Sequence, residues 1–170
     1  VADGDFPLPV EDAVGHFDPK IHSLVTQYRF DAGSGELCGL WNSRRFAPNW
    51  GITMILSVAA VSICDQLQIK NLFAICAGYT LRSAMRVGFT VERSVGRNGE
   101  FVYPNSSFVA RVLSMHCLTL ETTTLQYKQE ILALRENREL RTEININAEH
   151  LKVAYDLKLK RITSQVQQIF

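Results

Sequence analysis

The chain reads ELCGLWNSRRFAPN at residues 36–49 and continues directly into an apolar run at residues 50–67. Pro48 cannot donate to a sheet ladder and favours the end of a strand, whereas Asn49 is a residue type that begins helices. The stretch therefore predicts a strand at residues 37–46, a stop at Pro48 and a helix from Asn49 or just after it. In open α/β sheets, ligands bind beside the carboxyl end of such a strand and the adjoining helix N-terminus.

The residues that follow alternate between helix and strand patterns. Residues 52–67 are apolar on almost every side and too long for a typical strand, so they predict a buried helix. Residues 71–76 (NLFAIC) resemble a buried parallel strand. A second helix is expected at residues 79–87 with Gly88 as its C-cap. Strands are expected at residues 89–95 and 108–115, with a tight turn at residues 96–99 between them. This order predicts an α/β (α+β) fold, with a mixed sheet flanked by helices.

The two ends of the chain differ from this centre. Residues 1–17 contain two closely spaced prolines and predict a loop, followed by a short amphipathic piece at 20–27 and a glycine turn at 31–35. Residues 118–170 contain no proline or glycine. Their apolar residues recur at three- and four-residue spacing within 125–134 and 151–169, which predicts two amphipathic helices. We expect residues 1–117 to form the core and residues 118–170 a C-terminal helical extension.

Composition excludes several classes of protein. With 170 residues, 46% of them hydrophobic and 21% charged, the chain matches one ordinary globular domain. A net charge of +1 does not indicate a nucleic-acid-binding protein. The longest apolar run is too short to span a bilayer, and the N-terminus has no signal-peptide pattern, so a cytoplasmic location is expected.

The cysteines and histidines lack the spacing of chemical sites. The four cysteines are widely scattered without a CxxC pair, which favours buried free thiols in a reducing compartment. The four histidines have no ligand spacing, so no metal site is expected.

Three segments carry a resemblance to a known family. Residues 41–46 (WNSRRF) resemble the Trp-Glu-x-Ser-Arg-Phe signature of the bacterial autoinducer synthases, which make N-acyl homoserine lactones. Residues 79–89 (YTLRSAMRVGF) are similar to the arginine-dotted helix of the same family. Residues 4–12 (GDFPLPVED) resemble a segment of the related long-chain N-acyl tyrosine synthases, a group of N-acyl amino acid synthases. The element order also resembles the C-terminal half of the GNAT acyltransferase fold.

The resemblance spans residues 7–115 and implies a reaction. A fatty acyl group on the phosphopantetheine of an acyl carrier protein would be transferred to the amine of a tyrosine-like amino acid, with no permanently bound cofactor. No glycine-rich pyrophosphate loop is visible, which favours a carrier protein over coenzyme A as donor. In the related proteins several strands precede the signature, and residues 1–36 are too few to form them all.

The signature departs from the family at two positions. Asn42 stands where the lactone synthases have Glu, and Arg44 stands where they have Ser. Since an asparagine cannot act as a general base, a lactone synthase is the alternative assignment rather than the first. A non-catalytic GNAT-like interaction module is a further alternative.

Strand parity distributes the candidate site residues over two faces. Residues 36, 38, 40, 42 and 44 share one face and residues 37, 41, 43 and 45 the other, so Arg44 and Arg45 cannot both enter a site. The family places the second arginine at the substrate, so we expect Arg45 to bind an amino acid carboxylate through a bidentate fork. Asn42 is expected to orient the amine or a relay water. Glu36 is the nearest carboxylate on the Asn42 face, with a solvated turn residue as its other reading.

The remaining candidates surround the two substrates. Trp41 and Phe46 are candidates for the substrate pocket or for the core. Tyr79 and Arg82 are candidates for contact with the carrier protein or the donor arm. The apolar faces that include Leu157 and Ile162 would either roof a groove for the acyl chain or form a homodimer interface.

Overall fold

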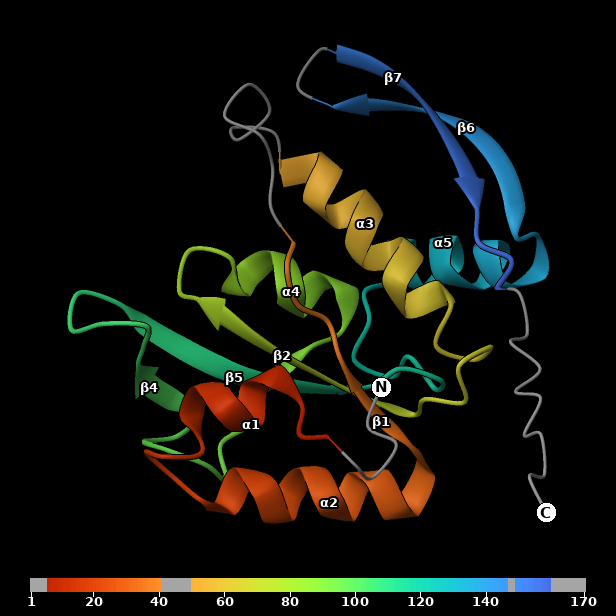
Figure 1. Cartoon of the computed structure of the whole chain (residues 1–170). Helices are drawn as coiled ribbons and strands as arrows, with labels where there is room; N and C mark the ends of the chain where they lie inside the picture. The colour runs from red at the N-terminus through yellow and green to blue at the C-terminus, as the bar shows by residue number, and fades with distance from the viewer. Residues whose placement is uncertain (1–5, 41–49, 147–148, 160–170) are drawn as a thin grey trace, which may run out of the picture.

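A computed structural model describes residues 6–40, 50–146 and 149–159, and its centre is a mixed five-stranded sheet (Figure 1). The strand order is β1-β2-β5-β3, and β4 also pairs with β5. The strands of this sheet are β1 (Ser34–Glu36), β2 (Asn71–Ala77), β3 (Thr90–Val91), β4 (Glu100–Val102) and β5 (Val109–His116). Only the β1–β2 pair is parallel within this described sheet; the other pairs are antiparallel. The predicted α/β class is confirmed.

The central strand β2 is covered by helices on both faces, which is why its sequence is apolar on both faces. Phe73 is fully buried among residues of α1 (Pro9–Val14) and α2 (Lys20–Ala32). Leu72 and Ala74 belong to a second core formed with α3 (Trp50–Ser62), α4 (Leu81–Val87) and α5 (Leu125–Glu136). Figure 1 shows α1 and α2 on one side of the sheet and α3, α4 and α5 on the other.

The predictions for the central elements are largely confirmed. The helices expected at 52–67 and 79–87 correspond to α3 and α4, and the strands expected at 71–76 and 108–115 correspond to β2 and β5. Gly88 follows α4 with φ +122°, in the region that favours glycine. Asn98 and Gly99 both have positive φ between the bonded residues Arg97 and Glu100, as in a tight hairpin turn.

Three predictions near β1 and β3 are wrong. The strand expected at 37–46 ends at Glu36, and residues 37–40 have no regular structure; residues 41–46 lie outside the described part. The expected loop at 1–17 contains α1, because Pro9 occupies the first helical position, where its missing N–H is not needed. The strand expected at 89–95 is limited to Thr90–Val91, since the Glu92 carboxylate turns the chain by accepting from the backbone N–H and hydroxyl of Ser94.

The second predicted C-terminal helix is also wrong. After α5 the chain forms the antiparallel hairpin of β6 (Glu139–Ile146) and β7 (Glu149–Asp156). Leu140, Thr142 and Ile144 alternate with exposed residues along β6, as Leu151, Val153 and Tyr155 do along β7. This period of two buries one face of the hairpin, with Leu140 and Tyr155 against the main core. The helical extension is therefore one helix and a hairpin, and its core is continuous with residues before position 118.

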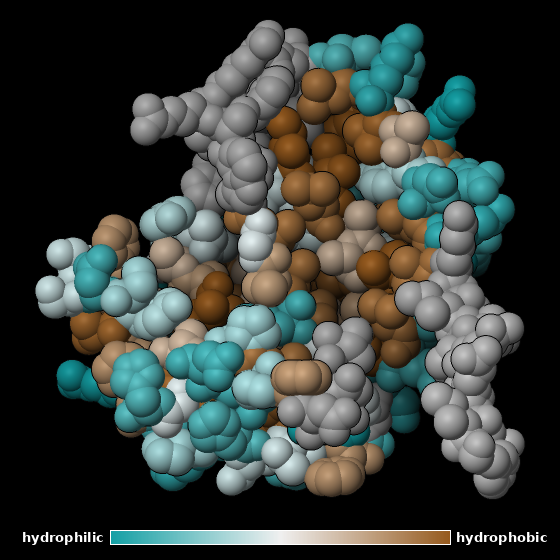
Figure 2. Space-filling model, viewed as in Figure 1, coloured by the Kyte–Doolittle hydropathy of each residue, from teal (hydrophilic) through white to brown (hydrophobic). Residues whose placement is uncertain are grey.

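Hydrophobic side chains also gather on the outer side of α3, below the hydrophilic residues of the hairpin (Figure 2). Leu56 of α3 is 43% exposed. Among the described residues, no helix combines the length and apolar character needed to cross a membrane.

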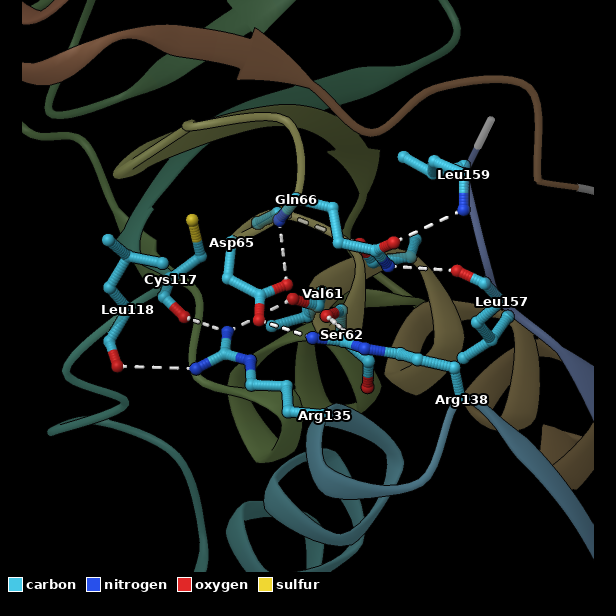
Figure 3. Close-up of polar contacts among 12 residues, drawn as sticks. Val61, Ser62, Asp65, Gln66, Cys117, Leu118, Arg135, Arg138, Leu157 and Leu159 are labelled. Atoms are coloured by element: carbon cyan, nitrogen blue, oxygen red, sulfur yellow. Dashed lines mark hydrogen bonds and ion pairs between the residues drawn. The ribbon is translucent and has the colours of Figure 1, made fainter. Parts of the chain in front are cut away.

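Arg135 at the end of α5 and Arg138 before β6 bind to the end of α3 through hydrogen bonds (Figure 3). Arg135 donates from Nη2 to the carbonyls of Val61 (3.1 Å) and Cys117 (2.6 Å). Arg138 donates to the carbonyl of Ser62 (2.7 Å) and forms an ion pair with Asp65. These cations satisfy carbonyls that the last turn of α3 cannot pair internally. The start of β6 is thereby fixed beside α3.

We expect Arg135→Ala to lower the free energy of unfolding by about 2–3 kcal/mol, because it removes charged hydrogen bonds to half-buried and buried carbonyls. Urea denaturation measures this change. Arg141→Ala, on the exposed face of β6, is the matched control and should change the value by less than about 0.5 kcal/mol. Equal effects of the two substitutions would contradict the fastening role.

Candidate functional site

The candidate site lies where β1 and β2 separate. The two strands pair from Ser34 and Asn71 to Glu36 and Phe73. The N–H of Leu37 then donates to the carbonyl of Phe73 at 2.8 Å. Beyond this bond β2 continues to Ala77, whereas residues 38–40 make no ladder with it. The parallel pair is therefore open on the carboxyl side of Phe73.

The open part of β2 presents backbone hydrogen-bonding groups. Successive residues of a strand direct their N–H and C=O groups to opposite edges, so Ile75 and Ala77 share the edge of Phe73. The carbonyl of Ala77 accepts from the N–H (3.0 Å) and the hydroxyl (2.9 Å) of Thr80. Within the described residues, no strand pairs with this edge at Ile75 or Ala77. Within the described part of the chain, the N–H and C=O of Ile75 and the N–H of Ala77 therefore have no strand partner.

A pocket of about 270 Å³, here called the edge pocket, adjoins this open edge. Its walls come from residues 37–40, from residues 74–77 of β2, and from one side each of α3 and α4. Thr53 and Ser57 line it from α3, and Thr80 and Ser83 line it from the start of α4. The pocket combines an apolar interior with a few hydroxyl groups, which is the common composition of small-molecule sites.

Cys76 is the thiol on β2 that lines the edge pocket. Burial raises its pKa, and the hydrogen bond with Thr80 and the charge of Arg111 only partly oppose this shift. A thiol with a raised pKa is poorly ionised at neutral pH and is therefore a weak nucleophile. The pocket is consequently better suited to holding a reactant than to forming a covalent intermediate on Cys76.

Glu36 lies in β1 but its side chain points away from the edge pocket. Its Oε2 accepts the N–H of Val10 at 2.6 Å, and this N–H belongs to the first turn of α1. The adjacent Gly35 faces Ile69 and Leu72 in the opposite layer, in agreement with strand alternation. Glu36 therefore caps α1, and it does not line the edge pocket beside Tyr79.

Of the other predicted residues that the structure describes, Tyr79 alone lines the edge pocket. Tyr79 lines the edge pocket and is 73% exposed, whereas Arg82 lies on a separate shallow surface of α4. Leu157 packs against the main core, and its carbonyl accepts from Gln66 at 2.8 Å (Figure 3). The remaining predicted residues lie outside the described residues: Trp41, Asn42, Arg45, Phe46 and Ile162.

Sequence reasoning missed the α4 side of the pocket. Thr80, Ser83, Ala84 and Val87 all line it, and their spacing of three, one and three residues places them on one helix face. This spacing was the signal that could have found them, because it distinguishes their face from that of Arg82 and Arg86.

A second cavity of about 610 Å³, here called the hairpin cavity, lies between α3, α5 and the β6–β7 hairpin. Met54 lines both this cavity and the edge pocket.

The described residues contain no group of three or more His, Cys, Asp or Glu side chains arranged to hold a metal ion. In comparisons with known proteins, no family model, curated protein or solved structure matches the chain.

The pH dependence of stability tests the capping role of Glu36. Burial raises its pKa, the hydrogen bond from Val10 opposes the shift, and the nearby Glu11 carboxylate adds to it. The folded state therefore binds this proton more tightly than the unfolded state does. The resulting stabilisation is complete below the ordinary glutamate pKa and is lost as the pH rises through the raised value.

Glu36→Gln mimics the neutral carboxyl, and its carbonyl can still accept the N–H of Val10. We expect the free energy of unfolding of Glu36→Gln to rise relative to that of the unaltered chain as the pH increases from about 4 to about 7. Urea denaturation at several pH values measures this difference. A difference that is constant over this range would contradict the buried, capping position.

Proposed function

We propose that the chain is an N-acyltransferase that moves a fatty acyl group from a pantetheine thioester to the amine of an amino acid. The observation that supports this proposal is the open edge of β2 at Ile75 and Ala77, next to the edge pocket. The resemblance of residues 41–46 and 79–89 to the autoinducer and N-acyl amino acid synthases supports the same reaction.

The pantetheine arm suits the open edge because it is an extended chain with amide groups. Such a chain can pair with an exposed strand edge through main-chain hydrogen bonds, as peptides do in β-augmentation. The N–H and C=O of Ile75 would pair with an amide of the arm. The N–H of Ala77 would then be available to the thioester carbonyl further along.

The same donor would stabilise the transition state. When the amine nitrogen attacks the thioester carbon, negative charge develops on the carbonyl oxygen, and a fixed backbone N–H at hydrogen-bond distance stabilises that charge. The new C–N bond forms, the C–S bond breaks, and the proton lost by the amine ends on the departing sulfur as a free thiol. The reaction therefore balances without a metal or a covalent enzyme intermediate.

The proposal that the acyl acceptor is an amino acid rests on the sequence rather than on the lining of the edge pocket. Arg45 is proposed to bind the carboxylate of the amino acid, since an arginine can form two parallel hydrogen bonds with a carboxylate. Asn42 is proposed to orient the amine. An acyl carrier protein is the proposed donor, and a fatty chain is favoured because each buried methylene contributes about 0.8 kcal/mol.

The activity is tested by incubating the protein with long-chain acyl carrier protein and a mixture of amino acids, followed by mass spectrometry. We expect an N-acyl amino acid as product. Ser83→Phe should lower kcat/KM at least about tenfold, because the larger side chain fills the edge pocket from α4. A lactone product would favour the autoinducer-synthase alternative. The absence of any acylated amine would exclude both acyltransferase assignments.

Met85→Phe is the matched control for Ser83→Phe. Met85 lies two residues further along α4, is 48% exposed and does not line the edge pocket. We expect this variant to keep kcat/KM within about twofold of the unaltered chain. If both variants lose activity equally, the edge pocket is not the donor site.

The carboxylate role of Arg45 is tested separately. Arg45→Ala should raise the KM for the amino acid at least about tenfold, because the loss of a charged bidentate contact weakens acceptor binding. The KM for the acyl donor should stay unchanged, and Arg44→Ala, at the position where the resembling family has Ser, is the control. An unchanged acceptor KM in Arg45→Ala would remove this assignment.

A further inference from the structure

The hairpin cavity is large and mainly apolar toward the core. Its volume of about 610 Å³ lies within the range typical of small-molecule sites, which is about 300–1,000 Å³. Met54 and Ile55 of α3, Leu134 of α5 and Leu140 and Ile144 of β6 line it. The two helices pack on each other through the main core, so they form the floor of the cavity and the hairpin forms its roof.

Thr142 shares the inward face of β6 with Leu140 and Ile144, whereas the carboxylates that line the hairpin cavity take part in exposed contacts. Glu143 is exposed on β6 and is ion-paired with His150 and Lys152. Glu130 on α5 accepts a hydrogen bond from Gln126 at 3.0 Å, and this contact is also exposed. These carboxylates disfavour an anionic ligand head beside them, whereas the interior accepts an uncharged alkyl chain.

Met54 lies between the hairpin cavity and the edge pocket and lines both. Thr53 and Ser57 are one turn apart on α3 and face the edge pocket, and Gly51 and Ile55 are one turn apart and face the hairpin cavity. At 100° per residue, Met54 lies between these two helix faces. Figure 1 shows α4 on one side of α3 and α5 with the hairpin on the other.

Among the described residues, Met54 is the one whose side chain lines both spaces. Met54 is 7% exposed, and its unbranched thioether chain can change rotamer more readily than a β-branched side chain. Val58, one turn further along the same face, is 1% exposed and belongs to the main core. A chain that passes from one cavity to the other would pass Met54.

From these contacts we infer that the hairpin cavity holds the alkyl tail of the acyl donor, which runs from the edge pocket past Met54 and ends under Leu140 and Ile144. This inference rests on the proposed function for the direction of the chain. The thioester lies at the open edge of β2, and the methyl end enters the hairpin cavity. The β6–β7 hairpin then determines how long a chain the protein accepts.

Ala133→Trp tests the inference without altering the edge pocket. Ala133 lines the hairpin cavity but is exposed, so the fold can accommodate a larger residue there. We expect Ala133→Trp to lower kcat/KM for dodecanoyl-pantetheine at least about tenfold and to change that for butanoyl-pantetheine less than about twofold. Leu132→Trp is the matched control, because Leu132 is 42% exposed on α5 and does not line the cavity.

A binding measurement separates this inference from the proposed function. A neutral probe, 12-(dansylamino)dodecanol, should increase in fluorescence on binding to the full chain, and Ala133→Trp should weaken its binding at least about tenfold. Leu132→Trp should leave binding unchanged.

The two assays distinguish the possible failures. Probe binding that is lost in Ala133→Trp supports the alkyl site even if no donor is ever turned over, in which case the proposed function fails alone. Acyl transfer whose chain-length preference is the same in Ala133→Trp and in the unaltered chain overturns the inference and leaves the proposed function standing.

Discussion

The hydrogen bond from the N–H of Leu37 to the carbonyl of Phe73 is the last contact of the only parallel ladder in the described sheet. Everything proposed for this protein depends on the ladder ending there. Because β2 continues to Ala77 with both faces covered by helices, its open edge is held rigidly while its neighbour departs. The edge pocket lies in the resulting space on the α3–α4 side, and Met54 lines both this pocket and the hairpin cavity.

The central elements could be predicted because their sequences fit one structure alone. NLFAIC at residues 71–76 is too short for a helix and too apolar for an edge strand, and Gly88 marks the end of α4 where a positive φ is required. The parallel pairing expected for residues 71–76 is confirmed by β1, although β1 is three residues long and ends at Glu36.

The errors occur where one segment fits both the spacing of a helix and the alternation of a strand. Leu151, Ala154 and Leu157 have helical spacing, but Leu151, Val153 and Tyr155 alternate as in a strand, and pairing with β6 decides between them. Glu36 was predicted at the site from its position in the chain. The direction of its side chain depends on β1 beginning at Ser34 and on α1 packing against the face of the sheet that carries Glu36. Neither feature can be predicted from residues 36–49.

The central claim, that the open edge of β2 binds the acyl donor, is tested most directly by amide hydrogen exchange followed by NMR. The ligand is an acyl-pantetheine analogue with a non-hydrolysable thioether in place of the thioester. The account predicts that the amides of Ile75 and Ala77 shift and exchange more slowly when this ligand binds, while the amide of Phe73, already within the ladder, changes little. Ligand binding that leaves Ile75 and Ala77 unchanged would contradict the account.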